Sequence, residues 1–331
     1  MADSERTAVV IPYFQREPGI LRRAVQSALG QRGVVSPHVI VVDDSSPLPA
    51  ARELAGLLPD HEQDIVILRQ PNAGPGAARN AGIDAISGPC GLVAFLDSDD
   101  EWNPDHLRNA LEAFRAGCDF YFADHVDYSG DTTRFGRSRA RGTFRTSDHP
   151  RIRPDSPLHW FSGDFVDQLI REFVIGAPTA VVRRSFLGRH RFPTSFRRAG
   201  EDHLLWLKLA ASGAKVAFSE AVECRTGKGV NVYDASGWGT EGALERAVDF
   251  TGLLAVMRLT YARTKTQKDL LSRRLADARR EFVRILVHDV ARGRWKSARF
   301  ILRQFRQDPL TLPVFLPEIT RILMERVKPV S

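Results

Sequence analysis

Short apolar runs alternate with segments of helical periodicity over residues 1–115. Strands are predicted where the runs are rich in β-branched residues, at residues 7–11, 38–42, 64–68 and 92–96. Helices are predicted where apolar residues recur at helical spacing, at residues 17–31, 50–58, 74–85 and 104–116. Continuous apolar strands are typical of a sheet that is covered on both faces. The alternation therefore predicts an α/β fold with a doubly wound sheet.

Polar residues follow three of the predicted strands directly. Pro12 and Tyr13 come after the first strand, Asp43 and Asp44 after the second, and residues 97–100 (Asp-Ser-Asp-Asp) after the fourth. In doubly wound sheets the ligand crevice lies beyond the carboxyl ends of the strands. We therefore expect these residues to share one ligand site.

The rest of the chain is less regular. Residues 129–157 hold seven arginines and predict a hairpin or mobile loop, which is either solvated or grips a phosphorylated acceptor. We expect a strand over 173–183, a helix over 200–211, and a flexible Gly-rich loop over 226–240 in which Lys228 is either solvated or in reach of a diphosphate. Amphipathic helices are predicted within 241–292 and over 294–307, before a Pro-containing tail. Two domains are predicted. The catalytic domain is expected at residues 1–240, with a first half at about 1–125 and a second half at about 126–240, and a basic helical region is expected at residues 241–331.

Composition and charge narrow the class of protein. With 331 residues, 43% hydrophobic and 26% charged, the chain is expected to be globular. No apolar run approaches a bilayer span, the N-terminus lacks the apolar core of a signal peptide, and three scattered cysteines suit the cytosol. The net charge of +7 is uneven, because residues 1–130 have 10 Arg, no Lys and 19 acidic residues. An acidic first third suits cation binding, and a basic remainder suits an anionic partner.

The aspartates after the strands have two interpretations each. Clustered carboxylates such as Asp97, Asp99 and Asp100 repel one another unless a cation lies between them, and Mg²⁺ or Mn²⁺ prefers such oxygen ligands. The alternative is a turn that caps the following helix. The position directly after a buried strand favours the metal site. Asp43 and Asp44 either accept hydrogen bonds from a base or a ribose, or form an Asx-turn.

Two further segments suggest binding and proton transfer. Residues 72–82 form a Gly-rich loop before a helix, where the backbone can approach an anion, although the spacing fits neither a dinucleotide motif nor a P-loop. Glu201 and Asp202 begin an apolar helix, where a carboxylate either stabilises the helix N-terminus or acts as a general base. We expect His203 and Trp206 to be structural, and Trp102 to be exposed beside a ligand or at the sheet edge.

The order of these motifs resembles family 2 glycosyltransferases with the GT-A fold. The resemblance extends roughly over residues 7–215 and rests on five segments, VVIPYFQREPGILRRAVQSALGQ, VIVVDDSSP, NAGPGAARNAGIDA, VAFLDSDDEWNPDHL and GEDHLLWLKLA. It implies a mixed GT-A sheet with a C-terminal α-helical extension, in which the first half of the catalytic domain is the nucleotide-sugar half and the second is the acceptor half. It also implies an inverting reaction, a nucleoside-diphosphate sugar as donor, and Mg²⁺ or Mn²⁺ as cofactor.

Roles follow from the resemblance position by position. The residues implied to bind the donor are Pro12, Tyr13, Asp43 and Asp44 at the nucleoside, Gly76 and Arg79 in the nucleotide pocket, and Asp97 with Ser98 at the ribose or donor sugar. The residue implied to bind the metal is Asp99. The general base would be Asp202, with Glu201 supporting it or touching the acceptor.

The C-terminal part of the sequence refines this expectation. No QxxRW motif follows residue 215, which favours a non-processive enzyme. The opening residues also resemble bacterial exopolysaccharide enzymes of the succinoglycan glucosyltransferase type, which implies transfer of glucose from a UDP-sugar to a saccharide or lipid-linked acceptor. The basic amphipathic helices then predict a cytoplasmic protein in peripheral contact with the anionic inner face of the cell membrane. Packing on the catalytic domain or formation of a homodimer is an equal alternative.

Two other classes of function compete with this one. The pI of about 9.6 suits a nucleic-acid-binding protein. However, the basic helices carry no aromatic stacking platform or recognition motif, so we expect no nucleic-acid partner. A non-catalytic sugar-nucleotide-binding protein would need a broken metal or base motif, and both motifs are intact.

Overall fold

The computed structural model describes residues 5–127, 130, 132–229, 237–294 and 298–327. Its strands are β1 (Arg6–Tyr13), β2 (His38–Asp43), β3 (Ile65–Arg69), β4 (Cys90–Phe95), β5 (Glu101–Trp102), β6 (Phe120–Val126), β7 (Leu158–Trp160), β8 (Val181–Arg183) and β9 (Val216–Arg225). Its α-helices are α1 (Ile20–Leu29), α2 (Ala50–Leu54), α3 (Leu58–His61), α4 (Pro75–Asp84), α5 (His106–Arg115), α6 (Arg134–Ala140), α7 (Phe165–Arg171), α8 (Arg184–Leu187), α9 (Glu201–Ala211), α10 (Ala243–Val256), α11 (Lys265–Ala291), α12 (Ala298–Gln307) and α13 (Leu312–Val327). Shorter helical turns are η1 (Thr146–Asp148), η2 (Ala177–Thr179), η4 (Met257–Tyr261, a π-helix) and η6 (Pro309–Thr311).

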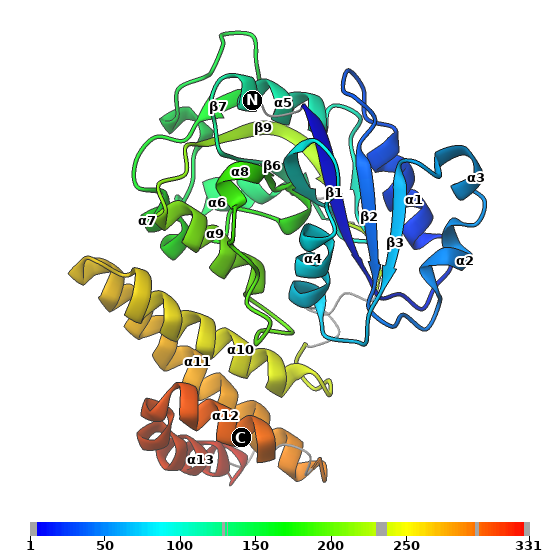
Figure 1. Cartoon of the computed structure of the whole chain (residues 1–331). Coiled ribbons are helices and arrows are strands. Elements are labelled where there is room, and N and C mark those ends of the chain that lie inside the picture. The colour runs from blue at the N-terminus through cyan, green and yellow to red at the C-terminus, as the bar shows by residue number, and fades with distance from the viewer. Residues whose placement is uncertain (1–4, 128–129, 131, 230–236, 295–297, 328–331) are drawn as a thin grey trace. The chain divides into compact units, whose positions relative to one another are not determined.

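The described strands form one mixed sheet. The strand order is β3-β2-β1-β4-β8-β6-β9-β5, and β7 also pairs with β9. β1 and β2 are parallel neighbours (Figure 1). β4 is parallel to β1 on its other side, and β8 is antiparallel to β4 and β6. The carboxyl ends of β1, β2 and β4 therefore meet at one edge, which confirms the predicted α/β class with a mixed sheet.

Alternate residues of β1 point to opposite faces of the sheet, and a helix packs on each face. Val9 lies in a buried cluster with Leu21 of α1. Val10 faces the other side, where α4 approaches so closely that a β-carbon added at Gly82 would lie 2.4 Å from Val10 Cγ1. Figure 1 shows α1 and α4 on opposite sides of the sheet. Gly82 thus permits the close packing of α4, and we attribute its place in the Gly-rich segment to this contact.

Four described strands of the second half of the sheet, β5, β6, β7 and β9, were not predicted from the sequence. β6 and β9 are parallel neighbours, with irregular register at Ala123–His125. The strand predicted over 173–183 is wrong over most of its length, because only Val181–Arg183 form a strand (β8) there and Ala177–Thr179 form η2. Trp206 of α9 is fully buried near the rings of Phe95 and Phe120, which confirms its structural role.

Ion pairs hold the Arg-rich segment. Residues 134–140 form α6, so the predicted hairpin or mobile loop is wrong there. Arg137 pairs with Asp127 at 2.5 Å, and Arg141 pairs with Glu172 at 3.2 Å. Pairs of this kind stabilise a fold only weakly. Arg141 is exposed as well as paired, so the predicted solvated surface agrees with the structure there, and the grip on a phosphorylated acceptor stays a prediction.

The chain forms two compact units, Met1–Ser195 with Glu201–Val230, and Phe196–Gly200 with Asn231–Ser331. In the second unit, α10 and α11 share a core that includes Val248 and Phe282. Thr264 and Gln267 form a capping box that starts α11. The predicted amphipathic helices are confirmed, and the tail, for which no helix was predicted, contains α13. Among the residues that the structure describes, no helix is long and apolar enough to cross a membrane.

Candidate active site

Three strand ends place polar side chains at one edge of the sheet. Tyr13 at the end of β1 is in register with Asp43 at the end of β2. Gln15 links the segments that follow the three strands. Its backbone N–H donates to Ser46 Oγ at 2.9 Å, and its Nε2 donates to Ser98 Oγ at 3.1 Å. Gln15 was not among the predicted site residues, and its position just beyond β1 was the only signal for it.

Arg79 of α4 joins two motifs that are far apart in the sequence. Its Nη1 donates to Glu201 Oε1 at 2.9 Å, and its Nη2 donates to Asp97 Oδ1 at 2.6 Å. The Arg79 side chain is only 5% exposed. Burial acts to lower the pKa of Arg79, but the carboxylates of Asp97 and Glu201 raise it overall, so this cation stays charged between them. The Gly-rich segment, the Asp97–Asp100 turn and the start of α9 therefore form one site.

Glu201 and Asp202 begin α9 at this site. Burial and the neighbouring Asp202 charge raise the pKa of Glu201 to about 7, although Arg79 opposes the rise. Burial also raises the pKa of Asp202, against the effect of Arg79 and of the His203 N–H, which donates to Asp202 Oδ1 at 2.7 Å. A carboxylate whose pKa lies above its ordinary range is a better proton acceptor at neutral pH than an ordinary surface aspartate.

Gly76 of α4 lies close to this acidic pair. A β-carbon added at Gly76 would lie 3.3 Å from Glu201 Cγ and 3.3 Å from the Pro193 carbonyl oxygen. The missing side chain therefore leaves room for Glu201 to reach Arg79. This is a packing role for Gly76, in addition to the role in the nucleotide pocket that the sequence predicts.

The Asp97–Asp100 turn alternates between half-buried and buried side chains. Asp97 and Asp99 are half-buried, whereas Ser98 and Asp100 are buried. The Asp100 N–H donates to the Asp97 carbonyl oxygen at 3.0 Å, which closes the turn. Burial, together with the charges of Asp97 and Asp99, raises the pKa of Asp100. The turn thus presents two carboxylates on one side and uses the other two side chains inside the fold.

Residues 226–229, here called the glycine loop, lie directly against Asp99. The Gly227 N–H donates to Asp100 Oδ1 at 2.9 Å. A β-carbon added at Gly227 would lie 1.7 Å from the Asp99 carbonyl oxygen, and one added at Gly229 would lie 2.6 Å from Asp99 Oδ2. Only glycine fits at these two positions. Lys228 between them is exposed, and residues 230–236 of the predicted flexible loop lie outside the described residues.

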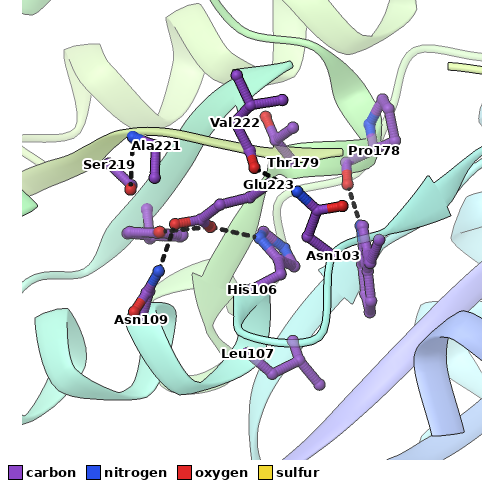
Figure 2. A network of polar contacts seen from close by, with 12 residues as sticks. Asn103, His106, Leu107, Asn109, Pro178, Thr179, Ser219, Ala221, Val222 and Glu223 are labelled. Carbon is purple, nitrogen blue, oxygen red and sulfur yellow. Dashed lines mark hydrogen bonds and ion pairs between the residues drawn. The ribbon is translucent and has the colours of Figure 1, made fainter. Parts of the chain in front are cut away.

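A buried network of hydrogen bonds holds β9, the strand that leads into the glycine loop. The Glu223 carboxylate accepts a hydrogen bond from Asn109 Nδ2 at 2.6 Å and lies 2.8 Å from His106 Nδ1 (Figure 2). It also accepts a hydrogen bond from Tyr121 OH at 2.7 Å. These bonds tie β9 to α5 and β6, and β9 runs directly into the glycine loop. Glu223 was not predicted, because no local pattern marks a single glutamate in an unrecognised strand.

Both aspartates after β2 are buried and accept hydrogen bonds from the backbone. Asp43 accepts from the N–H groups of Ser46 at 2.7 Å and Ala50 at 2.9 Å, which caps the start of α2. Asp44 accepts from the N–H groups of Ala73 and Gly74, both at 2.8 Å, and so holds the entry to α4. Asp43 accepts from N–H groups three and seven residues on, so it orders the following turn without the two-residue bond of an Asx-turn. The contact of Asp43 and Asp44 with a nucleoside stays a prediction.

Among the residues beside the site, Trp102 is the one whose position differs from the prediction. Trp102 is buried, and its Nε1 donates to the Pro178 carbonyl oxygen at 2.5 Å, so the predicted exposed position is wrong. His203 is also buried, and its Nε2 lies 3.0 Å from the Leu169 carbonyl oxygen, in agreement with a structural role. Pro12 is half-buried, and burial raises the pKa of Tyr13 to about 12.

The protein side chains of this site do not by themselves form a metal cage. Within the described ranges, no group of three or more His, Cys, Asp or Glu side chains is arranged to hold a metal ion. Asp97 and Asp99 nevertheless supply half-buried carboxylate oxygens, which are the ligands that Mg²⁺ and Mn²⁺ prefer. Mg²⁺ is commonly bound by one or two carboxylates together with substrate phosphates and water. The residues present fit a cation that is shared with a phosphorylated ligand.

Comparison with known proteins gives consistent matches to one family. Residues 8–189 match the family model described as glycosyl transferase family 2. The chain is 36% identical over 230 residues to the succinoglycan biosynthesis protein ExoW of Rhizobium meliloti, which covers 69% of this chain and 70% of that protein. Among solved structures, S. aureus TarS in complex with UDP-GlcNAc is similar with a TM-score of 0.56 and 15% identity, over 91% of this chain and 79% of that one. The Pyrobaculum calidifontis mannosyltransferase PcManGT, in complex with GDP-Man and Mn²⁺, is similar with a TM-score of 0.52 and 14% identity, over 97% of this chain and 84% of that one.

Proposed function

The chain belongs to glycosyl transferase family 2, and we propose that it is an inverting, metal-dependent and non-processive member that acts in polysaccharide biosynthesis. Its fold is GT-A, and the protein is a glycosyltransferase. The observation that carries the more detailed proposal is the double pairing of Arg79 with Asp97 and Glu201. It brings the two acidic motifs together at the edge of the sheet where ligands bind.

The proposed donor is a nucleoside-diphosphate sugar, with UDP-glucose as the specific expectation. Similarity to a succinoglycan biosynthesis protein supports an exopolysaccharide product, while glucose is the expectation from the sequence resemblance. The fold neighbours TarS and PcManGT were solved with UDP-GlcNAc and GDP-Man, which supports a nucleotide-sugar donor. We place the nucleoside near Pro12, Tyr13, Asp43 and Asp44, and the diphosphate near the Asp97–Asp100 turn. The proposed acceptor is a saccharide or a lipid-linked oligosaccharide.

We place Mg²⁺ or Mn²⁺ at Asp99, with Asp97 and Ser98 beside the ribose or donor sugar. When bound, such a cation neutralises charge that develops on a departing diphosphate. Asp100 and the glycine loop support Asp99 from within the protein. Gly227 lies against the Asp99 carbonyl oxygen and Gly229 lies against the Asp99 side chain, which limits the positions that its carboxylate can take.

The proposed general base is Asp202. It accepts the proton of the acceptor hydroxyl as that oxygen forms a bond to the anomeric carbon and the bond from this carbon to the diphosphate breaks. Attack on the face opposite the leaving group inverts the anomeric centre. Arg79 keeps Glu201 in place beside Asp202, and Glu201 in turn supports the base or touches the acceptor.

Turnover with a panel of donors tests this proposal. We expect transfer, or slow hydrolysis without an acceptor, with UDP-glucose in the presence of Mn²⁺, and weaker turnover with GDP-sugars. The control is the same reaction with EDTA in place of Mn²⁺. Donor binding by calorimetry without turnover of any donor would contradict the proposal and favour a non-catalytic sugar-nucleotide-binding protein.

Gly227→Ala is expected to lower transfer on the order of 100-fold. The added β-carbon would overlap the Asp99 carbonyl oxygen, so the glycine loop or the Asp97–Asp100 turn must move, and displacements of about 1 Å cost this much at a reacting site. Steady-state kinetics measure the effect, with Thr226→Ala in the same loop as the matched control, because it removes atoms and adds none. Full activity of Gly227→Ala would show that the loop does not position Asp99.

A further inference from the structure

Helix α13 has an inner and an outer face of different chemistry. On the inner face, Phe315 and Ile319 are partly buried against the core of α10 and α11. Glu318 is buried and accepts a hydrogen bond from Arg284 of α11 at 2.9 Å. The inner face therefore accounts for the packing of α13 within the second unit.

The outer face exposes large apolar side chains. Leu312, Leu316 and Met324 are 57%, 72% and 65% exposed, and their spacing of four and eight residues puts them on one side of the helix. We call these three residues the α13 stripe. Two more exposed leucines lie nearby in the sequence, Leu310 just before the helix and Leu302 on α12.

This exposure is concentrated in one part of the chain. Five of the nine large apolar residues that are exposed in the described chain lie between residues 302 and 324. Single exposed leucines are ordinary on protein surfaces, but a contiguous group marks an interaction surface. The inner face already packs α13 against its unit. Packing within the described chain therefore does not explain why the outer face carries exposed apolar side chains.

The charge around the stripe is basic. Residues 298–324 contain four arginines and two acidic residues. Both acidic residues, Asp308 and Glu318, are buried in ion pairs with arginines of α11. Arg299 and Arg306 of α12 are exposed. Exposed leucine side chains and exposed arginines thus occur together in this segment.

We propose that the α13 stripe, with the exposed arginines of α12, docks on an anionic membrane surface. Leucines on such a helix enter the boundary between headgroups and acyl chains, while arginines remain with the lipid phosphates. A second copy of the chain fits this surface less well, because a two-fold contact through the same stripe brings the same arginines together. The inference concerns how the chain reaches a lipid-linked acceptor, and it is independent of the donor chemistry proposed above.

Sedimentation of the full chain with lipid vesicles tests this proposal. Wild type is expected to bind vesicles that contain phosphatidylglycerol at low salt, and to bind pure phosphatidylcholine vesicles about tenfold less. The Leu312→Ser/Leu316→Ser variant should bind anionic vesicles about tenfold less than wild type. Arg299→Glu/Arg306→Glu should remove the preference for anionic lipid. Leu259→Ser, which changes a leucine that is 77% exposed outside the stripe in the same unit, is the matched control and should bind as wild type.

Two outcomes would overturn the proposal. One is unchanged vesicle binding by the double leucine variant. The other is a dimer, detected by light scattering, that the leucine substitutions dissociate while vesicle binding stays the same. Nucleotide affinity measured without vesicles should be equal in all variants, which shows that they are folded. A failure of the proposed transfer reaction would therefore leave this test unaffected.

Discussion

Asp202→Asn is expected to lower sugar transfer by about 10³-fold or more while donor binding persists, because asparagine keeps the shape of aspartate but accepts no proton. The amide oxygen can still accept the His203 N–H that now donates to Asp202 Oδ1, so the start of α9 should be preserved. Turnover and nucleotide affinity, measured on the same preparation, test this expectation. A variant with weak donor binding and normal turnover would place Asp202 in the donor pocket instead.

Asp164→Asn is the matched control for this prediction. Asp164 also lies at a helix N-terminus, where its carboxylate accepts the Asp167 N–H at 3.1 Å, but it begins α7 and is exposed. If loss of helix stabilisation were the cause of the Asp202→Asn defect, both variants would lose a similar share of activity and thermal stability. We expect only Asp202→Asn to lose transfer.

The pH dependence of the wild type follows from the same acidic pair. Burial raises the pKa of Asp202 and brings the pKa of Glu201 to about 7. A carboxyl group whose pKa is raised loses its charged form at a higher pH than an exposed one does, so transfer should begin to fall as the pH drops below about 7. A kcat/KM profile that stays flat down to about pH 5 would contradict a base in this buried pair.

Asp99→Asn is expected to lower turnover on the order of 100- to 1,000-fold at saturating Mn²⁺, because it removes one negative charge from the proposed cation site. The fold should be retained, since Asp99 is half-buried and the buried members of the turn, Ser98 and Asp100, are unchanged. In a titration of activity with Mn²⁺, the variant should need a higher Mn²⁺ concentration than wild type to reach half of its maximal activity. Asp60→Asn, on the exposed surface of α3, is the control and should titrate as wild type.

Full activity of the wild type in the presence of EDTA would contradict this role for Asp99. So would an Asp99→Asn variant whose Mn²⁺ dependence matches that of wild type. The two substitutions separate the two halves of the proposed mechanism, because one should act on metal dependence and the other on proton transfer.

The sequence alone was sufficient to predict the first half of the sheet. β1, β2, β3 and β4 are continuous apolar runs bounded by turn residues, and the helices between them have clear periodicity. These are local properties, since each depends on residues close together in the chain. The same locality explains why the positions of the two acidic motifs, one after a strand and one at the start of a helix, were recognisable.

Other parts of the fold were not recognisable for the opposite reason. β6 and β9 depend on pairing between residues about a hundred positions apart, which no local pattern encodes. The Arg-rich segment looked irregular because its helix α6 is short and its arginines find carboxylates elsewhere in the chain. No helix was predicted in the Pro-containing tail, yet α13 forms there with Pro317 inside it, and Phe315 and Ile319 pack against the core of the second unit.

The arrangement of the site depended on tertiary structure most of all. The sequence provided Arg79, Asp97 and Glu201 as members of three separate motifs, each with an ordinary structural alternative. The fold brings one guanidinium group within hydrogen-bond distance of both carboxylates, across 122 residues in the case of Glu201. It also sets two glycines against Asp99 from a loop that looked merely flexible. Local patterns determine which residues can do chemistry, but charge pairing and close backbone approach arise only when distant segments are packed together.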